Sequence, residues 1–292
     1  MLSNFFFEPP KKRKFFKKIK YSILKKVFLI KWFLICNIKY YIRIFFIRNT
    51  LDNNNIFILL LSKNRAEKFK RLLNSINILS KKKNRIKILV LLDEDEKMKE
   101  EYISISEDFK KKGLSIEIFF KNFHPYSLGM NFLAKKIKKE GLFCIFSDDL
   151  IITMNGWDDY IDYISSKLSK KKAFSIWTRS DAHTEKYYTL VEHPIVNSLW
   201  FKALGYIYEE KFSFIPDIQI CELGRISGSF IITKKIIYKH LRATEHPEEK
   251  DETYFNLQKF RETENYNWFP EWKKNVNKRI EDANKIKNLN YY

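Results

Sequence analysis

Two adjacent carboxylates, Asp148 and Asp149, are the residues whose type and position best suit chemistry. They follow the apolar run Phe143–Phe146 after a single residue, Ser147, and a short apolar run bounded by turn residues predicts a buried strand. Acidic side chains at the carboxyl end of such a strand lie where open α/β sheets bind ligands. Their oxygens suit Mn²⁺ or Mg²⁺, which can hold a diphosphate. Alternatively, both residues only begin a turn, where Asp is common.

Strands and helices alternate along the part of the chain that must position these carboxylates. Apolar runs predict strands over 56–61, 87–92, 114–120 and 143–146, and helical spacing predicts helices over 66–76, 98–112 and 131–139. This alternation predicts right-handed crossovers and a mostly parallel sheet flanked by helices. Such a sheet gathers the acids that follow its strands on one edge, so we expect Asp93 and Asp95 to lie near Asp148 and Asp149.

The composition excludes a disordered chain and supports a folded domain. The 292 residues are 45% hydrophobic and 16% aromatic, with only seven Gly and seven Pro, which is enough apolar material for a substantial core. Three Cys without CxxC spacing argue against a structural zinc site and for a reducing compartment. We expect the cytoplasm, with a peripheral position at the inner membrane face if the N-terminal segment binds lipid.

The net charge of +20 is concentrated at the N-terminus. Residues 1–50 contain 13 Lys and Arg and a single acid, Glu8. Between Lys11 and Arg48 the longest uncharged stretch, Trp32–Ile38, is far too short to span a bilayer, for which about 20 apolar residues are needed. A basic, aromatic-rich helix suits an anionic membrane surface. Alternatively, the segment packs on the domain as a helical extension. We favour less a third role, in which it contacts the phosphates of nucleic acid.

The order of motifs resembles the nucleotide-sugar-binding half of GT-A fold glycosyltransferases, nearest to the inverting family 2. A Ser62–Arg65 loop with the sequence Ser-Lys-Asn-Arg follows the first strand, Asp93 and Asp95 follow the second, and Ser127-Leu-Gly-Met-Asn131 resembles the family's small-x-x-Met-Asn helix start. Ser147-Asp-Asp149 stands at the Asp-x-Asp motif, with Gly156-Trp157 beyond it. The resemblance implies a GT-A-like, Rossmann-related α/β fold with a basic helical N-terminal extension.

The resemblance continues downstream and covers roughly residues 54 to 255. Leu204-Gly-Tyr206 is similar to the family's Gly-Gly-Phe segment, and Glu245-His246-Pro247 to its late His. Two positions depart from the family pattern. Ser147 replaces the first Asp of Asp-x-Asp, and Pro216 replaces the first acid of the usual acidic pair, which leaves Asp217 as the only candidate base.

The resemblance assigns a role to each site residue. Asp149 and His246 would hold Mn²⁺ or Mg²⁺ against the diphosphate, and Asp217 would deprotonate an acceptor hydroxyl as it attacks the anomeric carbon with inversion. A helix N-cap is the structural alternative for Asp217. The nucleotide-sugar-binding candidates are Ser62, Asn64, Arg65, Asp93, Asn131 and Asp148.

The sequence therefore predicts a basic segment over 1–52, a GT-A-like domain over 53–265 and a polar C-terminal tail over 266–292. The expected activity is transfer of a sugar from a UDP- or GDP-sugar to a glycan, lipid-linked or protein acceptor. A non-catalytic binding protein with a basic tail is the alternative, because Ser147 and Pro216 depart from the motifs. A sugar nucleotidyltransferase would carry a Gly-rich phosphate loop near the first strand, and residues 62–70 contain no Gly.

Overall fold

The computed structural model describes residues 54–122, 125–168, 172–180, 192–210, 216–243, 246–263 and 274–289. The basic N-terminal segment predicted over 1–52 lies outside these residues. Within the described part of the chain, no helix is long and apolar enough to cross a bilayer.

The described strands form one mixed sheet in the order β3-β2-β1-β4-β7-β6-β8-β5. Its first half consists of the parallel strands β3 (Ser115–Phe120), β2 (Ile86–Leu92), β1 (Asn55–Leu61) and β4 (Gly141–Ser147). Its second half contains β7 (Ile195–Asn197), β6 (Ser175–Ser180), β8 (Phe230–His240) and β5 (Leu150–Ile152). Among the described strands, only β7 and β5 are antiparallel to their neighbours, so the sheet is mostly parallel, as predicted.

Strand β1 shows how the sheet forms two cores. Side chains of a strand alternate between its faces, and every β1 side chain from Ile56 to Leu61 is buried. Ile56, Ile58 and Leu60 pack into one hydrophobic cluster, whereas Phe57, Leu59 and Leu61 pack into the other. The continuous apolar run in the sequence is therefore explained by helices on both faces of the sheet.

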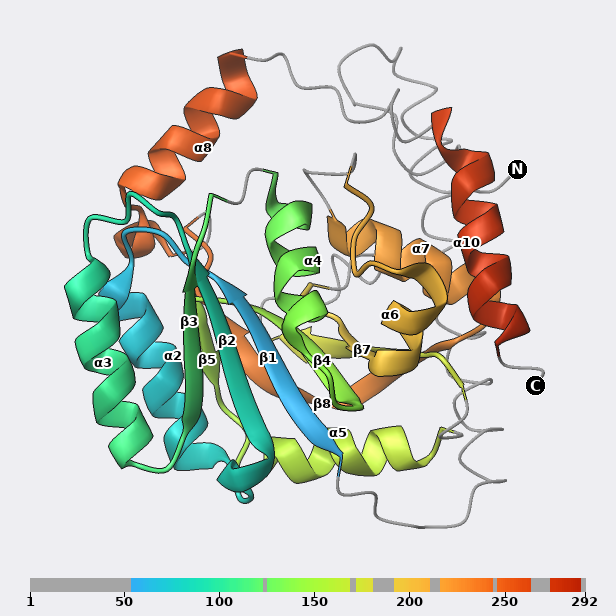
Figure 1. Ribbon diagram of the computed structural model, residues 1–292, viewed down its shortest axis with the longest axis horizontal. Helices are drawn as coiled ribbons and strands as arrows, with labels where there is room; N and C mark the ends of the chain where they lie inside the picture. Colours follow the sequence, from blue (N-terminus) through green and yellow to red (C-terminus); the bar gives the residue numbers. More distant parts are fainter. Residues whose placement is uncertain are drawn as a thin grey trace, which may run out of the picture.

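Helices cover both faces of the sheet (Figure 1). The cluster that contains Ile56 includes residues of α2 (Ala66–Leu79), α3 (Lys99–Lys111) and α5 (Trp157–Ser166). The opposite cluster includes residues of α4 (Tyr126–Lys136), α7 (Pro216–Ser227) and α10 (Val276–Asn288), with α6 (Ser198–Leu204) beside them. Two short 3-10 helices, η3 (Lys83–Arg85) and η4 (Pro247–Glu249), lie in connections, and α8 (Glu252–Thr263) follows η4.

The sequence located the strands more accurately than the helices. Helix α4 begins at Tyr126, five residues before the predicted start, so the Ser127–Asn131 motif lies inside its first turns. The apolar run after Asp149 forms the short strand β5, and the turn at Asn155-Gly156 leads into α5. Gly156 caps this helix with a φ of 69°, a left-handed conformation that glycine adopts without a Cβ clash.

The polar C-terminal segment contains a helix with a buried face. Helix α10 packs against α6 and α7, and Ala283 and Ile286 are completely buried there. Arg279, also buried, forms an ion pair with Glu222 of α7 at 2.7 Å. The domain boundaries proposed from the sequence remain predictions.

Candidate functional site

The carboxyl ends of β1 and β4 bring together the first group of candidate residues. Ser62 Oγ, just after β1, donates a hydrogen bond of 2.5 Å to Asp148 Oδ2, just after β4. Arg65 Nη1 donates to the other carboxylate oxygen of Asp148 at 3.2 Å. Tyr102 of α3 closes this group, because its hydroxyl lies 2.6 Å from Ser62 Oγ and accepts from the Arg65 backbone N–H at 2.9 Å. Two candidates from the loop after β1 and one from the distant loop after β4 thus form one cluster.

Asp148 is almost completely buried from solvent. Its exposed fraction is 2%, and burial raises its pKa to about 6, although the nearby Arg65 guanidinium lowers it. Desolvation disfavours a carboxylate because the charged form loses its water. Asp148 is therefore a hydrogen-bonding residue tied to the β1 loop.

Asp149 points toward a different set of partners. Ser147 Oγ donates to Asp149 Oδ1, and His240 Nε2, from the end of β8, lies 3.3 Å from the same oxygen. Burial alone would raise the pKa of Asp149, but the hydrogen bond and charge of His240, together with Ser147, hold it below its usual range. Ser147, which departs from the family pattern, thus supplies a donor that orients Asp149.

The Asp149 and His240 pair fits a divalent metal ion. Two ligands each about 2.1 Å from a metal, at angles between octahedral and tetrahedral, lie about 3.0–3.4 Å apart, and these two atoms are 3.3 Å apart. The ionised state of Asp149 also suits a ligand. His246, the predicted second ligand, instead has its Nδ1 3.1 Å from Glu248 Oε1 on its own 3-10 turn. His240 is the histidine that the structure places against Asp149.

A second carboxylate contacts the far side of the His240 ring. Glu192 Oε2 lies 2.8 Å from His240 Nδ1, and a hydrogen bond of this kind fixes the tautomer and orientation of a metal-binding imidazole. His193 stacks edge-on against His240 with ring centroids 4.7 Å apart. Glu192, His193 and His240 could themselves surround a cation, but Arg242 already forms an ion pair with Glu192. We therefore assign Glu192 to orientation of His240.

Asp93 and Asn64 lie at the end of the neighbouring strand pair. Asp93 follows β2, is 2% exposed and forms an ion pair with Lys63. Asn64 has a φ of 53°, a conformation that Asn tolerates better than most residues, and its backbone N–H donates to Glu96 at 3.0 Å. Asp93 Oδ1 and Asn64 Oδ1 are buried without a hydrogen-bond partner among the described residues. Such acceptors favour a ligand that brings N–H or O–H donors.

Asp95, also predicted at this edge, is exposed, whereas Glu96 beside it is buried. Glu96 accepts from the backbone N–H groups of Asn64 and Met98. Glu96 is therefore the acid that holds the loop after β1, through its hydrogen bond from Asn64. It was not singled out from the sequence within the acidic run 93–96.

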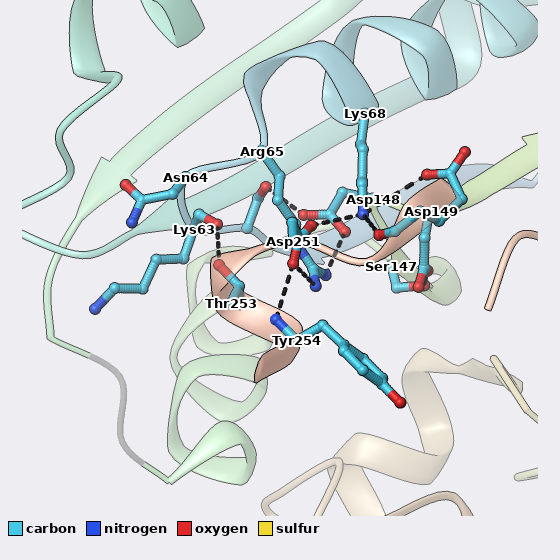
Figure 2. Close-up of polar contacts among 12 residues, drawn as sticks. Lys63, Asn64, Arg65, Lys68, Ser147, Asp148, Asp149, Asp251, Thr253 and Tyr254 are labelled. Atoms are coloured by element: carbon cyan, nitrogen blue, oxygen red, sulfur yellow. Dashed lines mark hydrogen bonds and ion pairs between the residues drawn. The ribbon is translucent and has the colours of Figure 1, made fainter. Parts of the chain in front are cut away.

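The segment 246–254 crosses the start of α2 and reaches Arg65. Arg65 Nη2 donates to Asp251 Oδ1 at 2.9 Å, and Lys68 Nζ donates to Asp251 Oδ2 at 2.6 Å. Figure 2 shows Arg65 between Asp148 and Asp251, with Thr253 bonded to the Lys63 carbonyl. Arg71 forms a bidentate pair with Glu249. This segment ties the last third of the chain to the loop after β1.

The candidate base lies in the first turn of α7. Pro216 is the first helical residue, a position that suits proline because the missing N–H would have no intrahelical partner. Asp217 is thus the second residue of the helix and not its N-cap. Burial raises its pKa to about 6, while Tyr208, His240 and the His193 backbone N–H act in the opposite direction. A carboxylate with a pKa near the working pH suits proton abstraction.

Asn131, predicted to bind the donor, has a different environment. Its amide forms three hydrogen bonds to the backbone of Ile207 and Tyr208. It is 2% exposed, so the structure places it under the Tyr208 loop. The sequence missed His240, Glu192, Tyr208 and Asp251. Only His240 carried a usable signal, because it ends a strand, and Asp148 likewise directly follows one.

No protein family model and no curated protein matches the chain. Among solved structures, it is similar to mannosyltransferase PcManGT from Pyrobaculum calidifontis in complex with GDP-Man and Mn²⁺, with a TM-score of 0.53, 8% identity, and coverage of 73% of this chain and 67% of that one. S. aureus TarS 1-349 in complex with UDP-GlcNAc gives a TM-score of 0.51 and 17% identity over 69% of this chain and 64% of that one.

The structure of S. aureus TarS 1-349 without a named ligand gives a TM-score of 0.51 at 16% identity and covers 64% of this chain. The chain spans 60% of the length of that structure. These similarities, together with the sheet order, show that the chain has the GT-A glycosyltransferase fold predicted from its motifs.

Proposed function

We propose that the protein is a metal-assisted glycosyltransferase that moves a sugar from a UDP- or GDP-sugar to the hydroxyl of a glycan, lipid-linked or protein acceptor, with inversion. The observation that carries the proposal is the position of His240. Its ring contacts Asp149, the candidate metal ligand, and it lies close enough to lower the pKa of Asp217, the candidate base. Both groups needed for the transfer therefore share one site.

The donor would bind along the edge formed by β2, β1 and β4. The unpaired acceptors Asp93 Oδ1 and Asn64 Oδ1 suit the N–H and O–H groups of a nucleoside. Arg65 and Lys68 lie next to Asn64 along the chain and form ion pairs with Asp251. Their cationic groups would exchange this carboxylate for the diphosphate when the donor binds. The similar structures were solved with UDP-GlcNAc and with GDP-Man, so either nucleotide is compatible with the fold.

Asp149 and His240 would hold the metal, with Glu192 orienting the imidazole. A divalent ion bound there supplies Lewis-acid stabilisation of the charge on the departing diphosphate. One nitrogen ligand favours Mn²⁺ over the harder Mg²⁺, which prefers oxygen ligands.

Asp217 would act on the acceptor. Its carboxylate accepts the proton of the acceptor hydroxyl while the hydroxyl oxygen bonds to the anomeric carbon from the face opposite the diphosphate. The bond from that carbon to the phosphate oxygen breaks, and its electron pair leaves with the nucleoside diphosphate. The products are the inverted glycoside and protonated Asp217, which returns the proton to solvent.

Calorimetric titration tests the donor half of this proposal. UDP, GDP and their common sugar conjugates are titrated with Mn²⁺ and with EDTA, using the unaltered protein, Asp149→Ala and the control Asp95→Ala, which removes an exposed acid from the same edge. We expect metal-dependent binding that is lost in Asp149→Ala and kept in Asp95→Ala. If the folded protein binds none of these nucleotides, the proposal is wrong and a binding protein that retains the fold becomes the better interpretation.

A further inference from the structure

The carboxylate of Asp217 is held by a buried tyrosine. Tyr208 Oη donates a hydrogen bond of 2.6 Å to Asp217 Oδ1, and the Tyr208 side chain has no exposed surface. Burial raises the pKa of Tyr208 well above its ordinary value, and the Asp217 charge raises it further. The phenol therefore stays protonated and can only donate toward Asp217 in the working pH range.

The Tyr208 backbone is in turn fixed by one side chain of α4. Asn131 Oδ1 accepts from the backbone N–H groups of Ile207 at 2.8 Å and Tyr208 at 3.1 Å, and its Nδ2 donates to the Tyr208 carbonyl at 2.7 Å. The reverse orientation of the amide would set its NH₂ group against two donors, so these neighbours determine which way it points. Gln219 Oε1 adds a bond to the next backbone N–H, that of Glu209, at 2.8 Å.

We infer that Tyr208 is a positioning residue for Asp217 and that Asn131 anchors it, so that α4 sets the orientation and basicity of the base. This inference rests on the proposed role of Asp217 in the transfer. A hydrogen bond donated to a carboxylate stabilises its charged form and limits its rotation. Tyr208 thus offsets part of the effect of burial and keeps Asp217 usable as a base near neutral pH.

Other groups also face Asp217 and would remain in a Tyr208 variant. His240 and the His193 backbone N–H favour its charged form. The rings of Tyr126 and Tyr238 lie near enough for their pKa values to be raised by the Asp217 charge. Tyr126 is the useful comparison, because its ring lies 6.0 Å from that of Tyr208 and none of the hydrogen bonds found among the described residues joins its hydroxyl to Asp217.

Replacement of Tyr208 by Phe tests the inference with little change in shape. The Asp217 carboxyl is titrated by NMR in protein with ¹³C-labelled aspartate, assigned by comparison with Asp217→Asn, and the pH profile of kcat/KM is measured in parallel. We expect Tyr208→Phe to raise both the NMR pKa and the acidic limb of the profile by about one pH unit, the size expected for a lost hydrogen bond to a charged group. Tyr126→Phe should shift either value by much less.

An unchanged Asp217 pKa in folded Tyr208→Phe, or an equal shift in Tyr126→Phe, would overturn the inference. The NMR titration needs no turnover, so it can be read even if no donor or acceptor supports transfer. If Tyr208→Phe raises the Asp217 pKa but no transfer is detected, the positioning of Asp217 by Tyr208 is supported and the proposed function fails.

Replacement of Asn131 by Ala tests the anchor. If Asn131 acts through Tyr208, Asn131→Ala raises the Asp217 pKa in the same direction, and the double variant with Tyr208→Phe shifts it no further than Tyr208→Phe alone. Affinity for UDP or GDP should be unchanged. A loss of nucleotide affinity without a change in the Asp217 pKa would mean that Asn131 contacts the donor and does not anchor Tyr208.

Discussion

His240 Nε2 lies 3.3 Å from Asp149 Oδ1, and this contact joins the end of β8 to the end of β4. The two residues are 91 positions apart in the chain. They become neighbours because Asp149 lies in the turn between β4 and β5, and the next residue, Leu150 of β5, pairs directly with His240 of β8. A carboxylate and an imidazole at this spacing can bind one metal ion, whereas the histidine chosen from the sequence, His246, bonds to its own turn.

The first prediction concerns this pair. His240→Ala should weaken Mn²⁺ binding by at least tenfold, because it removes a ligand nitrogen, and Glu192→Gln should weaken it less, because it only loosens the imidazole. Free Mn²⁺ is measured by its EPR signal during titration of the protein. His246→Ala is the matched control and should bind Mn²⁺ normally. Equal losses in His240→Ala and His246→Ala would argue against the assignment of His240.

The second prediction concerns pH. Burial raises the pKa of Asp217 to about 6, so the base is protonated below this value. We expect kcat/KM to fall about tenfold per pH unit below pH 6 and to level off above it. A profile that stays flat between pH 5 and 7 would exclude Asp217 as the base.

The same pKa has a consequence for stability that does not depend on activity. The folded protein binds the Asp217 proton more tightly than the unfolded chain, whose Asp has its ordinary pKa of 3.8. The free energy of unfolding should therefore decline, relative to Asp217→Asn, as the pH rises from about 4 to about 6. Urea unfolding of both proteins at several pH values measures this difference.

The third prediction concerns a buried ion-pair cluster on the opposite side of the sheet from α4. Arg85 bonds to Asp162 at 2.6 Å and to Asp159 at 3.0 Å, and lies 3.5 Å from Asp158. Asp158 and Asp162 are buried, so removal of the guanidinium leaves buried carboxylates with less compensation. Arg85→Ala should lower the free energy of unfolding by about 3–5 kcal/mol.

Lys87 provides the control for Arg85. Its pair with Glu117 is 2.6 Å long but about half exposed, so Lys87→Ala should cost less than about 1 kcal/mol. Urea unfolding measures both variants, and similar losses would mean that the burial of Arg85 does not matter.

The strands and the edge of the sheet were predictable because their signal is local. The runs that became β1, β2 and β4 are mostly apolar, and acids follow two of them within two residues, so chain order alone placed Asp93, Asp148 and Asp149 at the edge of the sheet. Asp217 was singled out by its position in the motif order, and its role as the base stays a prediction.

The partners of these residues were not predictable, because they depend on contacts between distant segments. Asp251 reaches Arg65 across 186 positions, and nothing in the residues around Asp251 indicates this pairing. Asn131 occurs in a motif that predicts binding of the nucleotide-sugar donor. Its amide instead forms hydrogen bonds with the backbone of Ile207 and Tyr208, in the loop that packs on α4. The start of α4 was misplaced because Tyr126–Met130 has no strong helical period.

The last prediction concerns the basic N-terminal segment, which lies outside the described residues. With 13 Lys and Arg and one acid in residues 1–50, it should bind anionic membranes, where each basic residue near the surface contributes about 1 kcal/mol. Deletion of residues 1–50 should release the protein from phosphatidylserine vesicles in sedimentation assays. Nucleotide affinity should stay unchanged, because every donor-site residue proposed above lies beyond residue 61. Binding of the full chain should also weaken with added salt and disappear on neutral vesicles. Vesicle binding that survives the deletion would place the membrane contact on the domain itself.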